Sequence, residues 1–102
     1  MIHLTQLVYV HPGKEDVFHQ FEDVAIPLIA KHYGELLLRI RPNADSIVAS
    51  HIEVPYEIHI VRFPSDEDFA SFAQDEERRR FLHLKNESIR SALLIKGTTG
   101  ER

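Results

Sequence analysis

The chain has 102 residues, of which 43% are hydrophobic and 27% charged, and this composition is typical of one globular domain and excludes global disorder. The formal net charge of −4 is the wrong sign for a nucleic-acid-binding protein. The absence of cysteine excludes disulfides and thiolate chemistry, and no apolar run approaches the ~20 residues of a membrane span. We expect one cytoplasmic domain over residues 1–102, with 98–102 as a frayed tail.

The first half of the chain predicts a strand followed by a helix. Apolar residues alternate over residues 2–10, and the strand ends at His11-Pro12-Gly13. Apolar residues then recur at helical spacing up to Tyr33-Gly34, where the glycine is expected to be the left-handed C-cap. Because Pro27 lacks a backbone donor, we expect a kink or a break inside this helix.

The second half predicts three strands, over residues 35–41, 57–63 and 92–96. Residues 42–55 form a long and apolar connection, which predicts a flap or a short extra strand packed on another surface. Ser65 precedes Asp68 by three residues, a spacing typical of a helix N-terminus. A further helical segment is predicted from about residue 76 to 90.

The resulting order, β-α-β-β-α-β, predicts an α+β, ferredoxin-like fold: a four-stranded antiparallel sheet with both helices on one face. The strands are apolar on both faces; in residues 35–41 the expected sets are Leu36, Leu38 and Ile40 on one face and Leu37, Arg39 and Arg41 on the other. The helices leave one face with about six large apolar side chains, each worth ~1.5–3 kcal/mol when buried. We therefore expect a homodimer, with sheet packed on sheet.

Arg39 lies in the middle of a mostly apolar strand, where an unpaired charge is costly. It either holds the carboxylate or enolate of a ligand, or forms a salt bridge across the subunit interface. Arg62 presents the same alternatives nearer a strand end. The acidic residues available as partners are Glu35, Glu53 and Glu57.

Three further hypotheses involve histidines. His32, at the end of the first helix, is either an acid–base residue or a helix-terminal histidine satisfied by carbonyls. His59 and Tyr9 lie on strands and would suit either the wall of a ligand cavity or a satisfied core. His51, Glu53 and His59 are the best trio for a metal, although partly exposed imidazoles with ordinary hydrogen bonds are the simpler interpretation.

Residues 78–80 are three arginines that directly follow three acidic residues at 75–77. Six charges of balanced sign indicate a solvated helix face and not a nucleic-acid footprint. The four glycines are scattered, so no phosphate-binding loop is present, and no Gly-x-Ser-x-Gly motif indicates a hydrolase.

An ordered set of residues runs along almost the whole chain: Tyr9, Pro27, Lys31-His32-Tyr33-Gly34, Arg39, Phe63-Pro64-Ser65, the residues from Asp75 to Phe81, and Gly97. This set resembles the small bacterial family called domain of unknown function 1330, in the dimeric α/β-barrel superfamily. The resemblance implies a ferredoxin-like subunit whose sheet closes with a partner's sheet into a barrel. The superfamily includes cofactor-independent monooxygenases, lactone isomerases, dehydratases and haem proteins. Glu35, where the family often has a second glycine, and the long 42–55 loop depart from the pattern.

Three functions remain open at this point. The first is an isomerase, hydratase or monooxygenase without a cofactor, acting on a small anionic or aromatic compound held by Arg39, with His32 or His59 moving the proton. The second is a binding protein with the same pocket and no turnover. The third is a dimer with no small-molecule role. None of them involves a nucleic acid or a membrane as partner.

Overall fold

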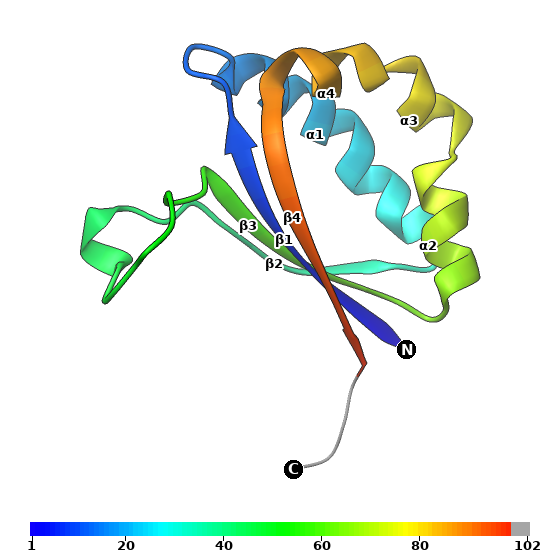
Figure 1. Cartoon of the computed structure of the whole chain (residues 1–102). Coiled ribbons are helices and arrows are strands. Elements are labelled where there is room, and N and C mark those ends of the chain that lie inside the picture. The colour runs from blue at the N-terminus through cyan, green and yellow to red at the C-terminus, as the bar shows by residue number, and fades with distance from the viewer. Residues whose placement is uncertain (99–102) are drawn as a thin grey trace.

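The computed structural model describes residues 1–98 and confirms the predicted fold class. Strands β1 (Ile2–Val10), β2 (Glu35–Ile40), β3 (Glu57–Phe63) and β4 (Ile89–Thr98) form one antiparallel sheet in the order β2-β3-β1-β4. Helices α1 (Glu15–Lys31), α2 (Asp66–Ala73), α3 (Glu76–Arg80) and α4 (Leu82–Ser88) lie on one face of this sheet (Figure 1). Of the predicted frayed tail, Thr98 ends β4 and the remainder lies outside the described residues.

The link between α1 and β2 differs from the prediction at two points. Of the expected kink or break at Pro27, the break is wrong, because α1 continues through Pro27 to Lys31. The left-handed residue after the helix is Tyr33, with φ of 66°, and not Gly34. Glycine is required at position 34 for space, since a Cβ there would lie 2.5 Å from Cε1 of Phe63.

The second half of the chain also departs from its predicted boundaries. The helical region from 76 to 90 is two short helices, α3 and α4, joined at Phe81, and β4 begins earlier and ends later than residues 92–96. The long connection before β3 contains only a 3-10 turn, Ala44–Ser46, and protrudes away from the sheet (Figure 1). No strand forms there, so the expected extra strand is wrong, and Val48, Ile52 and Val54 are exposed on this subunit.

The hydrophobic core lies between the sheet and the helices. Alternate residues of β1 and β3 face the helices, because successive side chains of a strand point to opposite faces. The buried hydrophobic residues are Ile2, Leu4, Val8, Phe18, Phe21, Ala25, Leu28, Ile29 and Phe63. This layer fixes the spacing between α1 and the strands, and therefore the walls of the site described below.

A β-bulge in β2 decides which of its side chains face the helices. The register with β3 shifts between Leu36 and Leu38, so that Leu37 is an extra residue. After the bulge Arg39 shares the helix face of the sheet, while Leu38 and Ile40 face the other way. The prediction that Leu36, Leu38 and Ile40 line one face is therefore wrong, since it assumed strict alternation.

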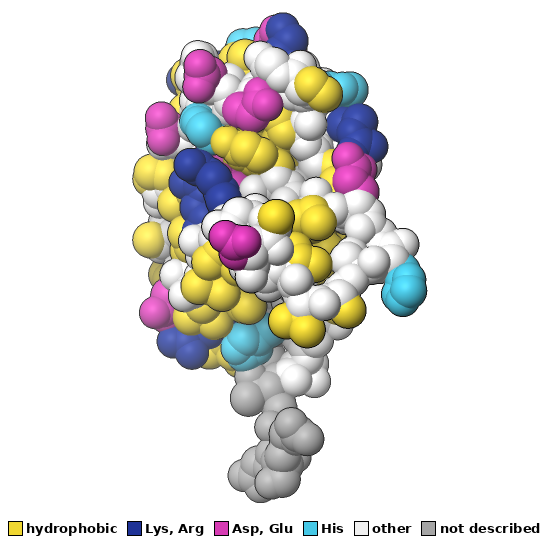
Figure 2. Space-filling model, turned by 90° about the vertical axis from the view of Figure 1, so that its left-hand side faces the viewer, with side chains coloured by type: hydrophobic (Ala, Val, Ile, Leu, Met, Phe, Trp, Pro, Cys, Tyr) yellow, Lys and Arg dark blue, Asp and Glu magenta, His cyan; other side chains and the backbone are white. Residues whose placement is uncertain are grey.

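The sheet face that no helix covers is apolar, as the sequence predicted. Figure 2, which views the side that carries the long loop, shows hydrophobic side chains gathered over much of the surface. By register, the apolar residues of the uncovered face are Leu7, Leu38, Ile40, Ile58, Ile60, Leu93 and Ile95. Leu93 and Ile95 are each 51% exposed, and together with their neighbours they form a contiguous apolar surface of the kind that marks an association site.

Candidate functional site: a cavity between the sheet and the helices

A cavity of about 300 Å³ lies between the helix face of the sheet and the helices. Its wall is largely aliphatic and aromatic, with contributions from β1, β2, β3, β4 and all four helices. The polar residues that line it are Gln6, Glu22, His59, Arg78 and Lys85. Leu94 also lines the cavity and is 48% exposed, so the cavity opens to solvent beside β4. An apolar cavity with a few converging polar groups is the usual form of a small-molecule site.

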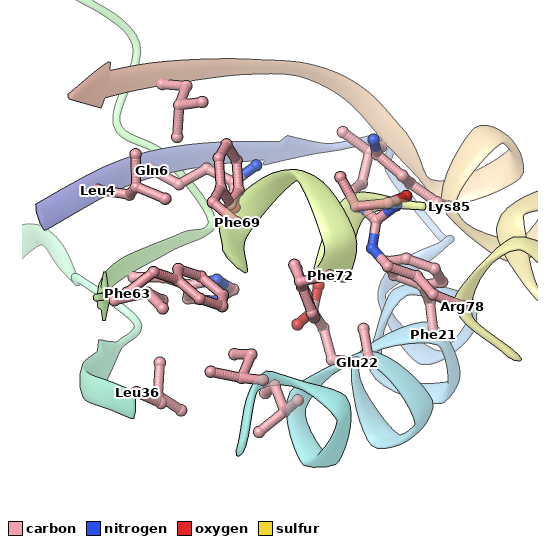
Figure 3. A pocket seen from close by; sticks show the side chains of 18 residues that line it. Leu4, Gln6, Phe21, Glu22, Leu36, Phe63, Phe69, Phe72, Arg78 and Lys85 are labelled. Atoms are coloured by element: carbon pink, nitrogen blue, oxygen red, sulfur yellow. The ribbon is translucent and has the colours of Figure 1, made fainter. Parts of the chain in front are cut away.

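The two ends of the cavity differ in chemistry (Figure 3). Apolar side chains, among them Leu36, Phe63 and Phe69, gather at one end, whereas Arg78 and Lys85 lie together at the other. The carboxyl group of Glu22 projects from α1 into the space between these ends, beside Phe72 (Figure 3).

Glu22 is the residue at this site that the sequence reasoning missed. It is 8% exposed, lies on the buried stripe of α1 with Phe18 and Ala25, and forms no hydrogen bond within residues 1–98. Burial raises the pKa of its carboxyl group, and the nearby Arg39 and His59 side chains partly oppose that rise. The signal available in the sequence is an acidic residue at an apolar position of the helical repeat of α1.

His59 lines the cavity from β3, and Glu57 holds its ring from the same face of that strand. Nε2 of His59 lies 2.7 Å from Oε1 of Glu57, and the two residues are 5% and 0% exposed. Because an ionised carboxylate only accepts hydrogen bonds, Nε2 carries a proton, and in the neutral form of the ring Nδ1 is therefore an acceptor. A carboxylate that fixes the tautomer of a histidine is a recurring element of acid–base sites.

Two arginines hold Glu57 in turn. Nε and Nη2 of Arg39 donate to its two oxygens over 2.7 and 3.1 Å, and Nε of Arg41 donates over 2.6 Å. Burial by itself would raise the pKa of Glu57, but the hydrogen bonds from His59, Arg39 and Arg41 outweigh it and lower that pKa to about 2. The bulge in β2 places Arg39 on this face, so its carboxylate partner belongs to the same subunit. Arg39 does not line the cavity, and its role as a ligand clamp stays a prediction.

The other predicted site residues lie elsewhere. Nε2 of His32 is 2.7 Å from Oδ2 of Asp75, the residue that caps α3, so His32 joins the end of α1 to that helix and does not line the cavity. Tyr9 donates its hydroxyl to the backbone oxygen of Glu53 over 2.9 Å. Arg62 forms an ion pair of 2.6 Å with Glu35 across β2 and β3.

The predicted metal trio is not assembled. Within residues 1–98 no group of three or more His, Asp or Glu side chains is arranged to hold a metal ion. His51 is exposed in the protruding loop, the Glu53 carboxylate pairs with Arg90, and His59 is buried beside Glu57. The spacing suggested proximity, but the loop carries its residues away from the sheet.

Within residues 1–98 no helix is long and apolar enough to cross a membrane.

Arg78 is also placed differently from the expected solvated face. It lies on α3 over the rings of Phe72 and Phe21, with its guanidinium carbon 5.2 and 5.6 Å from their centroids. Seven residues further along the chain, Lys85 lines the same cavity from α4. The acidic residues around Arg78 in the sequence concealed this inward orientation.

Comparisons with known proteins identify the fold alone. No family model and no curated protein matches the chain. A Rhodopseudomonas palustris protein of unknown function aligns over 99% of this chain and 83% of its own, with a TM-score of 0.82 and 15% identity. An antibiotic biosynthesis monooxygenase aligns over 99% of this chain and 100% of its own, with a TM-score of 0.70 and 10% identity. A Bacteroides fragilis protein, described as dimeric and ferredoxin-like, aligns over 96% of this chain and 95% of its own, with a TM-score of 0.65 and 13% identity. The chain thus shares the ferredoxin-like fold with proteins that are largely uncharacterised.

Proposed function

We propose that this protein is an enzyme without a cofactor that moves a proton on a small, largely apolar compound bound in the cavity. The observation that carries the proposal is that Glu22 and His59 line the same cavity. Glu22 is a buried carboxyl group without a hydrogen-bond partner within residues 1–98, and His59 is oriented by Glu57. Burial of a carboxyl group without partners is destabilising, so its presence in a cavity points to chemistry.

The two groups suit opposite tasks. Nδ1 of His59 is an acceptor for a proton from carbon, while Glu22, whose pKa burial raises, holds a proton closer to neutral pH than an ordinary glutamate. Transfer from one carbon of the ligand to His59, and from Glu22 to another, isomerises the ligand with no co-reactant. Hydration of a double bond needs the same two groups and one water molecule. Cofactor-free oxygenation of an enolisable compound starts with the same removal of a proton and needs dioxygen as co-reactant, so the fold neighbour described as a monooxygenase is consistent with this site.

We also propose that the protein works as a homodimer of the dimeric α/β-barrel type, as the resemblance to domain of unknown function 1330 implies. The uncovered apolar face of the sheet supports this, because a second copy would bury it without new chemistry. One fold neighbour is described as dimeric. Light scattering coupled to size-exclusion chromatography at micromolar concentration is expected to give about twice the 11.8 kDa of one chain; a single-chain mass would refute it.

Proton transfer is tested directly by hydrogen–deuterium exchange. The protein is incubated in D₂O with a panel of small enolisable ketones, keto acids and unsaturated lactones, and deuterium incorporation at carbon is followed by proton NMR. We expect catalysed exchange with at least one compound, and its loss by a factor of about 10² or more in Glu22→Gln and in His59→Asn.

Matched controls separate the site from general damage to the fold. Asp23→Asn changes the exposed neighbour of Glu22 on the same helix, and His51→Asn changes an exposed histidine, so both are expected to retain exchange. Exchange that survives both cavity substitutions would refute the proposal. Binding of a panel compound with no exchange would instead support the alternative, a binding protein without turnover.

A further inference from the structure

The cavity carries an excess of positive charge at one end. Arg78 and Lys85 both line it, and the only acidic side chain among its lining residues is Glu22. Neither cation forms a hydrogen bond or a close ion pair with Glu22 within residues 1–98. The charges of this site are therefore not balanced by the cavity's own residues.

Arg78 is held rigidly but is incompletely bonded. Its Nη1 donates to the backbone oxygen of Ala73 over 3.1 Å, and its guanidinium group lies over the rings of Phe21 and Phe72. Its Nε is buried and has no hydrogen-bond partner among the described residues. An unsatisfied buried donor is destabilising unless another group, such as a ligand, accepts its hydrogen bond.

Lys85 completes the arrangement from the next helix. It forms no hydrogen bond and no ion pair within residues 1–98, although its side chain is half-buried. Burial and the neighbouring charge of Arg78 lower the pKa of its ammonium group, which Glu22 only partly offsets. An anion between Arg78 and Lys85 would offset the repulsion between the two cations and favour the charged form of Lys85.

We propose that Arg78 and Lys85 form the subsite for the ionised group of the ligand, and that the ligand is a small carboxylate with an apolar or aromatic body. This inference rests on the proposed function, because it concerns the same cavity. The carboxylate would lie at the cationic end and the body against Phe63, Phe69 and Leu36 at the other end (Figure 3). Glu22 would then stand beside the middle of the ligand, where a proton would be exchanged. The volume of about 300 Å³ limits the body to roughly one ring or a short chain.

The test compares two probes of nearly equal shape, phenylacetate and its neutral amide, phenylacetamide. Isothermal titration calorimetry on the full chain at neutral pH measures both affinities. We expect phenylacetate to bind at least about tenfold more tightly, since hydrogen bonds to charged groups are worth more than neutral ones. Arg78→Gln and Lys85→Met should each remove most of this difference while leaving binding of the amide within about twofold.

Arg79→Gln serves as the control, because Arg79 is the exposed neighbour of Arg78 on the same helix. Should Arg78→Gln fail to fold, Lys85→Met provides the same comparison from α4. Equal affinity for the two probes, or a preference that survives both cavity substitutions, would overturn the anion subsite and leave the exchange assay on Glu22 and His59 unaffected. Failure of both probes to bind would also overturn the subsite, whereas the loss of all exchange activity bears on the proposed function instead.

Discussion

The backbone at Gly34 lies close to the core side chains Phe63 and Ile29, and glycine is therefore required there. A Cβ at position 34 would lie 2.5 Å from Cε1 and 2.8 Å from Cδ1 of Phe63, and 2.8 Å from Cγ2 of Ile29. Ordinary contacts between carbon atoms are about 3.5–4.0 Å, so the Gly34→Ala methyl group would be about 1 Å too close. Phe63 is 1% exposed and packs on Phe69 and Phe72, with ring centroids 5.5 Å away in each case, so its ring has little room to move.

Overpacking of this kind is destabilising by about 1–3 kcal/mol. The alanine also restricts the unfolded chain, which returns about 0.4–1 kcal/mol. We therefore expect Gly34→Ala to lower the free energy of unfolding by about 1–2 kcal/mol, seen as a lower urea midpoint with an unchanged slope.

Gly97→Ala is the matched control, because a Cβ at that position meets no atom within 4 Å. Its effect should stay within about 0.5 kcal/mol of zero. Shortening the obstructing ring by Phe63→Leu should make the Gly34→Ala substitution less harmful in the double variant than in the wild-type background. If Gly34→Ala unfolds at the same urea concentration as Gly97→Ala, the steric argument for this glycine is refuted.

Two further predictions concern buried charge. Glu57→Gln leaves Arg39 and Arg41 with a weaker acceptor and should lower the free energy of unfolding, measured in urea at pH 7, by roughly 3 kcal/mol. The exposed Glu67→Gln is the control and should have little effect. Equal urea midpoints for the two variants would contradict the stabilising role of the Glu57 network. The folded-state pKa of Glu57, about 2, lies below its ordinary value of 4.5, so its stabilisation is present above pH 4.5 and is lost as the pH falls toward 2. Hydrogen bonds from His32 and Lys31 also lower the pKa of Asp75. The urea midpoint of the wild-type protein should therefore decrease as the pH is lowered from 6 to 3, and it should decrease less steeply in Glu57→Gln. Parallel curves for the two proteins would count against this account.

Local sequence patterns determined most of the architecture. The alternation in β1 and β3 predicted both strands at their observed bounds, because breakers such as His11-Pro12-Gly13 and Pro64 stop them in any tertiary context. Ser65 predicted the start of α2, since its hydroxyl accepts a hydrogen bond from the backbone of Asp68. The uncovered apolar face followed from the strands alone, because side chains on both faces can be counted before any packing is known.

The site depended on information that no local pattern contains. The extra residue Leu37 reverses the facing of Arg39, and only the pairing of β2 with β3 reveals it. The spacing within α1 places Glu22 on a helix face, but whether that face meets water or a cavity depends on how far the helix stands from the sheet.

The environment of Arg78 also could not be predicted from the sequence. Its charged neighbours in the sequence are typical of a solvated surface, yet α3 turns this one side chain toward Phe21 and Phe72. Periodicity describes a segment's own repeat, which arises from backbone geometry over a few residues. The environment of a charged side chain arises from contacts between segments distant in the sequence, and these are fixed only when the sheet and the helices pack together.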